Sequence, residues 1–87
     1  MVFKEFTVKA INGLNSKAAG ALVAQANQYE SVLTLKYRHE VADLKSIMNV
    51  MGLVIRRGEA FSITADGKDE VAALEGMTAL AQSIHLV

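Results

Sequence analysis

The sequence predicts an α+β fold, in which helices pack on one face of a mainly antiparallel sheet. Two observations lead to this class. Short segments alternate apolar with polar residues, which is the period of a half-buried strand. Between these segments, apolar residues return every three or four positions, as on one face of a helix. The resulting order is β-α-β-β-α-β-α, and helices interleaved with few short strands are typical of α+β domains.

The first half of the chain contains three predicted strands and one helix. Phe6, Val8 and Ala10 alternate with polar residues as a first strand, and Asn12-Gly13 ends the pattern. Asn15 or Ser16 is the natural N-cap of the helix that follows. Its apolar face is formed by Ala19, Leu22, Val23 and Ala26. Leu33, Leu35 and Tyr37 mark a second strand, and a turn near His39 leads into a short third strand at Val41.

A short helix follows, beginning at Ser46 and ending near Gly52. It has no polar face, because apolar residues lie on both of its sides. One cluster is Ile47, Met48 and Met51, and the other is Val50, Leu53 and Val54. So short a helix cannot bury every side against one sheet, so we expect one cluster to face solvent or a partner.

The last part of the chain predicts a fourth strand and a final helix. Phe61, Ile63 and Ala65 alternate with polar residues after the Arg56-Arg57-Gly58 loop. Asp66-Gly67 turns the chain, and Asp69-Glu70 supplies the negative charge that a helix N-terminus favours. The buried stripe of this helix is expected to be Val71, Leu74, Met77, Ala81 and Ile84.

Length and composition exclude several classes of protein. The 87 residues predict one domain, residues 1–87, and 52% hydrophobic with 21% charged residues excludes a disordered chain. Nine basic residues balance nine acidic ones, which disfavours binding to nucleic acid or to a membrane surface. The longest apolar stretch, Ala18 to Ala24, is far shorter than the roughly 20 residues of a membrane span. The N-terminus does not have the pattern of a signal peptide, so we expect a soluble cytoplasmic domain.

The residues give little support to catalysis or to metal binding. His39 and His85 are isolated from each other, and the chain has no cysteine. No serine lies in a nucleophile elbow. Gly13 and Gly58 are single turn glycines, so no phosphate-binding loop is visible and no cofactor is expected. An ordinary hydrolase or transferase is therefore disfavoured.

Ser46 and Lys17 each allow two interpretations. The ordinary role of Ser46 is that of a helix N-cap. The alternative is phosphorylation, because a phosphate at this position would meet free backbone amides and the positive end of the helix. Lys17 is a cation in the first turn of a helix, where the dipole opposes it. It is either a solvated surface residue or part of a site for an anion or for a partner's carboxylate.

Three motifs resemble HPr, the histidine-containing phosphocarrier family of the sugar phosphotransferase system, in its Gram-positive form. Leu44-Lys45-Ser46-Ile47-Met48-Asn49-Val50-Met51-Gly52-Leu53 is similar to the family's regulatory-serine segment. Gly13-Leu14-Asn15-Ser16-Lys17-Ala18-Ala19 has the spacing of its active-site loop, and Ala65-Asp66-Gly67-x-Asp69-Glu70 also fits. The resemblance implies an open-faced sandwich, with three helices on one face of a four-stranded antiparallel sheet. It also implies a loop histidine that relays a phosphoryl group from phosphoenolpyruvate and a serine modified by HPr kinase/phosphorylase.

This sequence departs from the family at the carrier site. Asn15 stands in place of the histidine, Lys17 in place of an arginine and Ala18 in place of a proline. An amide is not nucleophilic, and a lysine lacks the fork with which arginine holds phosphate. We therefore expect no phosphocarrier activity.

Loss of the histidine with retention of the serine resembles the Crh subgroup, the catabolite-repression HPr-like proteins. This implies that Ser46 is the phosphoacceptor and that the chain is a corepressor of a LacI-type catabolite control regulator. Ile47, Met48 and Met51 would then be the apolar contacts and Lys17 a charged contact. Two alternatives stay open. One is an interaction module that needs no phosphate, with a homodimer formed by strand exchange or edge pairing. The other is a residual carrier that uses His39.

Overall fold

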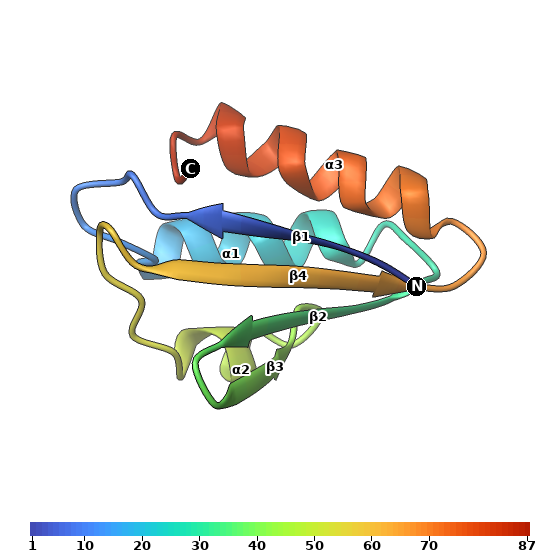
Figure 1. Ribbon diagram of the computed structural model, residues 1–87, viewed down its shortest axis with the longest axis horizontal. Helices are drawn as coiled ribbons and strands as arrows, with labels where there is room; N and C mark the ends of the chain where they lie inside the picture. The colour runs from blue at the N-terminus through green and yellow to red at the C-terminus, as the bar shows by residue number, and fades with distance from the viewer.

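The computed structural model describes residues 1–87 and contains four strands and three helices in the predicted order (Figure 1). The strands are β1 (Val2–Thr7), β2 (Val32–Tyr37), β3 (Glu40–Asp43) and β4 (Ala60–Asp66). The helices are α1 (Ser16–Ala26), α2 (Ile47–Met51) and α3 (Glu70–Ser83). None of these helices has the length and apolar content that a membrane span requires.

The strands form one antiparallel sheet in the order β1-β4-β2-β3. Because β4 lies between β1 and β2, the two edge strands are β1 and β3. Phe6 pairs with Phe61, and their rings stack with centroids 5.4 Å apart. The expected α+β class, with a four-stranded antiparallel sheet, is confirmed.

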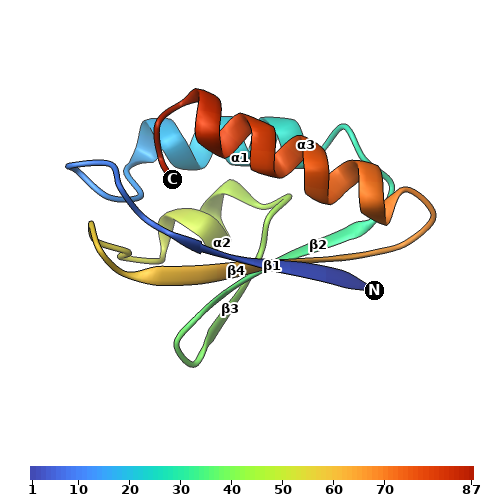
Figure 2. The ribbon, with the colours of Figure 1, turned by 45° about the horizontal axis from the view of Figure 1, so that its top comes forward.

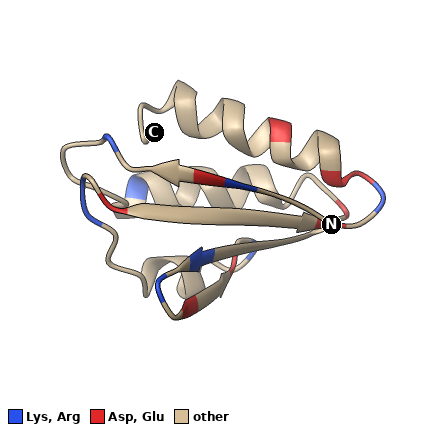
Figure 3. Cartoon of the chain, in the orientation of Figure 1, with Lys and Arg blue, Asp and Glu red and all other residues tan.

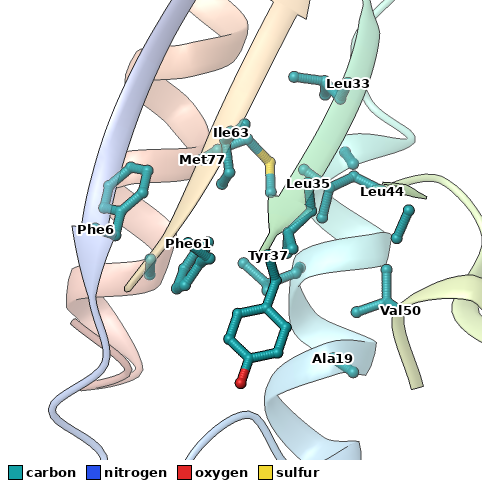
Figure 4. Close-up of a cluster of buried hydrophobic side chains, with 14 of the residues drawn as sticks. Phe6, Ala19, Leu33, Leu35, Tyr37, Leu44, Val50, Phe61, Ile63 and Met77 are labelled. Atoms are coloured by element: carbon teal, nitrogen blue, oxygen red, sulfur yellow. The ribbon is translucent and has the colours of Figure 1, made fainter. Parts of the chain in front are cut away.

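The helices cover one face of the sheet and leave the other face open (Figure 2). Between the two layers lies a core of 20 buried hydrophobic residues. Figure 4 shows Leu33, Leu35 and Ile63 of the sheet directed into this core, with Met77 of α3 beside Ile63. The buried residues of α1 are Ala19, Leu22 and Ala26, as predicted, whereas Val23 is only half-buried.

The buried stripe of α3 differs from the expected one. Ala73, Met77 and Ala81 face the core, and Leu74 and Ile84 are half-buried. Val71, which the sequence placed in the stripe, is 60% exposed. A helix turns by about 100° per residue, so Val71, two positions before Ala73, lies outside the buried row and instead lines a groove with Val2 of β1.

Two further expectations need correction. The first strand begins at Val2 and ends at Thr7, because beyond Val8 the amides of Lys9 and Ala10 donate to the carbonyl of Leu86 instead of to the sheet. Val54 is exposed, although the sequence grouped it with the buried Val50 and Leu53. The helix has ended before Val54, and burial alternates from Leu53 to Ile55, so Val54 points away from the core.

Asp69 joins the start of α3 to the segment between α1 and β2. Its carboxylate accepts hydrogen bonds from the amides of Glu30 and Ser31, both at 2.9 Å, and from the hydroxyl of Ser31. Ser31 is buried, so its polar groups depend on these bonds. The bond from the Ser31 hydroxyl, followed by the bond from the Glu30 amide, holds the pKa of Asp69 below its usual value.

We expect Asp69→Asn to lower the Tm by more than about 5 °C at pH 7. A carboxylate whose pKa is lowered by folding stabilises the protein above its unfolded pKa of about 3.9, and this contribution is lost as the pH falls through the folded pKa. The difference in Tm between the parent and Asp69→Asn should therefore shrink below about pH 4. Thermal unfolding followed by circular dichroism measures the two Tm values at each pH. An equal difference in Tm at neutral and acid pH would contradict a stabilising role of the Asp69 carboxylate.

Candidate functional site

The loop between β1 and α1 is fixed against the segment that precedes β4. Gly13 has a φ of 65°, and a Cβ added to it would lie 2.3 Å from the carbonyl oxygen of Ile55. The amide of Leu14 donates to the same carbonyl at 2.9 Å. Glycine is thus required here both by its left-handed conformation and by the close approach of another backbone. This contact fixes the position of Asn15, the residue directly before α1.

Asn15 is the N-cap of α1, which decides between the two caps that the sequence allowed. Its backbone is extended, and its Oδ1 accepts a hydrogen bond from the amide of Ala18 at 2.9 Å. Asn15 and Lys17 are both exposed, and Lys17 makes no ion pair. Figure 3 shows further basic segments at the end of the molecule where α1 begins. This end can therefore attract a negatively charged partner.

A hollow of about 280 Å³ lies beside Asn15 and Lys17. It is lined by Ala10, Gly13, Asn15, Lys17, Ala18, Ala21, Ile84 and Leu86. The C-terminal residues thus meet the start of α1, which the sequence pattern did not predict. No residue of α2 lines this hollow, so Asn15 and Lys17 do not share it with Ser46 or its apolar neighbours.

Ser46 is the N-cap of α2, as predicted. Its Oγ accepts hydrogen bonds from the amide of Asn49 at 3.3 Å and from Asn49 Nδ2 at 3.1 Å. Ser46 is half-buried, and these two bonds hold its hydroxyl in place. Sequence reasoning missed the role of Asn49. The signal was its position three residues after the cap, where side chains often reach back to the cap residue.

Lys45 and Asn27 hold the start of α2 against the end of α1. Asn27 Nδ2 donates to the carbonyl of Lys45 at 3.3 Å, and Lys45 Nζ donates to the carbonyl of Tyr29 at 2.6 Å. The ammonium group of Lys45 is therefore used to anchor the chain, although the residue adjoins Ser46. These contacts join positions far apart in the sequence, and no local pattern indicates them.

Ile47, Met48 and Met51 form an exposed apolar surface, here called the methionine patch. Their exposed fractions are 39%, 83% and 53%. Val50, on the other side of α2, and Leu53, which follows the helix, are buried in the core. The prediction that one apolar cluster of this helix faces outward is confirmed.

Glu59 is the centre of a polar cluster that the sequence did not indicate. It accepts hydrogen bonds from the Tyr37 hydroxyl at 2.7 Å, from the Arg56 amide at 2.8 Å and from the Arg38 guanidinium. The bond from Tyr37 is the main cause of the lowered pKa of Glu59, and it also raises the pKa of Tyr37. The charge of Glu59 is paired with Arg38 within the fold, so this cluster links β2 to the start of β4.

The histidines lie apart from these residues. His39 is in the turn between β2 and β3, and His85 follows α3; both are exposed. The structure contains no group of three or more histidine, aspartate or glutamate residues with the spacing of a metal site.

Comparison with known proteins places this geometry in a family. The model described as the PTS HPr component phosphorylation site matches residues 2–83. The phosphocarrier protein HPr of Lysinibacillus sphaericus is 34% identical over 86 residues, covering 99% of this chain and 98% of the relative. The histidine-containing phosphocarrier protein of Mycoplasma has a TM-score of 0.96 and 28% identity, covering 99% of this chain and 98% of that one. Crh of Bacillus subtilis, described as a dimer with a swapped domain, has a TM-score of 0.75 and 32% identity over all of both chains.

Proposed function

Because the chain belongs to the HPr phosphocarrier family, we propose that it is a regulatory member of that family and neither a phosphoryl carrier nor an enzyme. In this proposal residues 1–87 act as one domain. Ser46 accepts phosphate from HPr kinase/phosphorylase, and the phosphorylated chain is a corepressor of a LacI-type catabolite control regulator. The observation that carries the proposal is the position of Ser46, which caps α2 directly beside the methionine patch.

The surroundings of Ser46 suit a phosphate group. Its Oγ already accepts two hydrogen bonds from Asn49, one from the main chain and one from the side chain. A phosphate adds oxygen acceptors and negative charge at this point, and donors at a helix start stabilise both. Modification of Ser46 therefore does not require α2 to unfold.

The methionine patch supplies an apolar surface next to the modified residue. Met48 is 83% exposed and lies beside Ile47 and Met51, and an exposed apolar cluster is typical of an interaction surface. Methionine side chains are flexible and polarisable, so they adapt to the surface of a partner. A regulator that contacts both the phosphate and this patch would distinguish the phosphorylated chain from the unmodified one.

Asn15 and Lys17 support the loss of carrier activity and leave a charge for the regulator. The Asn15 carboxamide is not a nucleophile, and its oxygen is occupied as a helix cap. The ammonium of Lys17 is exposed and has no ion-pair partner in the chain, so it is available to a carboxylate of the regulator. Lysine offers a point charge where the family has the arginine fork, so this contact is weaker and less directional.

A second candidate function is an interaction module that binds its partner without phosphorylation. The observation in its favour is that the methionine patch is exposed in the unmodified chain. In that case Ser46 would be only a helix cap, and a phosphate would change binding little.

The Ser46 assignment is tested by the mass of the intact chain after incubation with HPr kinase/phosphorylase and ATP. We expect the parent chain to gain the mass of one phosphate. The control variant Ser16→Ala, which removes an exposed serine at the start of α1, should gain the same mass. Ser46→Asn should remain unlabelled. Asparagine is the matched replacement because it caps helices as well as serine does and has no hydroxyl. Phosphate on Ser46→Asn, or an unlabelled parent chain beside fully labelled HPr, would contradict the assignment.

A further inference from the structure

We propose that two copies of this chain associate through the free edge of β1, each β1 running antiparallel to that of its partner. The proposal rests on the edge of the sheet and does not depend on phosphorylation of Ser46. It also differs from strand exchange, because each β1 stays paired with β4 of its own chain.

β1 is an edge strand of the sheet (Figures 1 and 2), so its outer edge has main-chain groups without a partner strand. The amide of Val8 donates to Glu59, and its carbonyl accepts from Gly58, so Val8 directs its main-chain groups toward the sheet. Because these directions alternate along a strand, Phe3, Glu5 and Thr7 direct theirs toward the free edge. Such an edge is a template for another strand.

The free edge ends at Thr7. The amides of Lys9 and Ala10 both donate to the carbonyl of Leu86, at 2.7 Å and 3.2 Å, so the C-terminal segment occupies the edge beyond β1. A two-fold pairing must therefore be centred within residues 1–7. This limit leaves only a few possible registers.

Charge selects among these registers. A pairing centred on Lys4 or on Glu5 sets that residue directly opposite the same residue of the partner, and like charges in this position are destabilising. A pairing centred on Phe3 sets two aromatic side chains opposite each other, which is favourable. Phe3 is 73% exposed on the open face of the sheet. In this register Lys4 is opposite the partner's Val2.

An apolar groove runs beside the same edge on the helix-covered face. Its volume is about 340 Å³, and it is lined by Val2, Lys4, Val71, Leu74, Glu75, Thr78, Ala79 and Gln82. Pairing of the β1 edges would bring the partner's β1 across this groove and cover Val71, whose exposure the sequence did not predict. Lys4 and Glu75 carry opposite charges in one groove, so two copies related by a two-fold axis are complementary in charge here.

The other edge of the sheet is less suited to pairing. β3 has only four residues, and both of its ends are acidic, at Glu40 and Asp43. Short, charged edge strands resist addition of another strand. The outer edge of β1 is therefore the one we assign to the second copy.

The association is tested by sedimentation equilibrium over a dilution series of the intact chain. We expect a reversible monomer–dimer equilibrium, and Phe3→Asp should raise its dissociation constant at least about tenfold by placing two carboxylates opposite each other. Val41→Asp is the matched control, since Val41 is 65% exposed on β3, and it should leave association unchanged. A monomer at all concentrations up to about 1 mM, or a dimer sensitive only to Val41→Asp, would overturn the proposal.

Engineered cysteines separate edge pairing from strand exchange, because the natural chain contains none. Phe3→Cys should form a covalent dimer on mild oxidation, since directly paired residues have Cα atoms about 5.5 Å apart. Glu5→Cys should not, because its counterpart is about four residues away along the strand. Phe3 pairs with Thr64 of β4 within the sheet. The double variant Phe3→Cys/Thr64→Cys should therefore form its disulfide mainly within one chain. The control Phe3→Cys/Thr64→Asn has no second cysteine and should still form the dimer linked through β1. A dimer linked between positions 3 and 64 would show strand exchange and overturn edge pairing.

Discussion

The parent chain, without substitutions, is expected to gain no acid-labile phosphate when incubated with phosphoenolpyruvate and the general phosphotransferase enzyme. The proposed function places Asn15 at the position of the family's phosphohistidine. The nitrogen lone pair of a carboxamide is delocalised into its carbonyl group. The Oδ1 of Asn15 is moreover engaged with the amide of Ala18 at 2.9 Å. The side chain therefore has neither the nucleophilicity nor the freedom for phosphoryl transfer.

Asn15→His is expected to make the chain a phosphoryl acceptor. Residue 15 lies exposed at the start of α1, where free amide groups face an incoming phosphate. Adding Lys17→Arg should increase labelling further, because a guanidinium binds phosphate through two parallel hydrogen bonds. Asn12→His is the matched control, since it places an imidazole in the same loop but before the helix cap. Acid-labile phosphate on the unmodified chain, or equal labelling of the two histidine variants, would show that the carrier site has been misidentified.

Gly13→Ala is expected to lower the free energy of unfolding by more than about 2 kcal/mol. The φ of 65° costs an alanine about 1–2 kcal/mol, and the new Cβ would lie 2.3 Å from the carbonyl oxygen of Ile55. That carbonyl also accepts the hydrogen bond from Leu14, so the loop cannot move away without losing it. The same substitution should therefore also disturb the position of Asn15.

Gly20→Ala is the control for this effect, with the opposite expected sign. Gly20 is inside α1, and a Cβ added there would meet no atom beyond its own helix backbone within 4 Å. Alanine is favoured over glycine in a helix by about 0.5–1 kcal/mol, so this variant should be more stable than the parent by that amount. Urea unfolding measures both variants, and a change of the same sign in the two would contradict the argument.

The strands were predictable because the helices cover only one face of the sheet. Burial then alternates along the two central strands, as at Leu33, Leu35 and Tyr37, and this alternation is visible in the sequence. The stripe of α3 was predicted less well. Asp69, at its start, is fixed by bonds to Ser31, 38 positions earlier, and no local pattern reveals which residues of the helix will then face the sheet.

The candidate site was predictable where its chemistry is local. Asn15 and Ser46 are helix caps, and residue type together with the start of an apolar period indicates a cap. The contacts that position α2 were not predictable. Lys45 bonds to Tyr29, 16 positions away, and only the packing of α1 against α2 brings them together.

The most direct test of the regulatory role is the affinity of the chain for its regulator with and without phosphate on Ser46. Calorimetric titration of a LacI-type catabolite control regulator should show at least about tenfold tighter binding of the phosphorylated chain, because a charge-assisted phosphate contact is present in that form alone. The phosphorylated Met48→Lys variant should bind more weakly than the phosphorylated parent, since it disrupts the methionine patch. Equal affinity for the phosphorylated and the unmodified chain would contradict the regulatory switch and favour an interaction module that acts without phosphate.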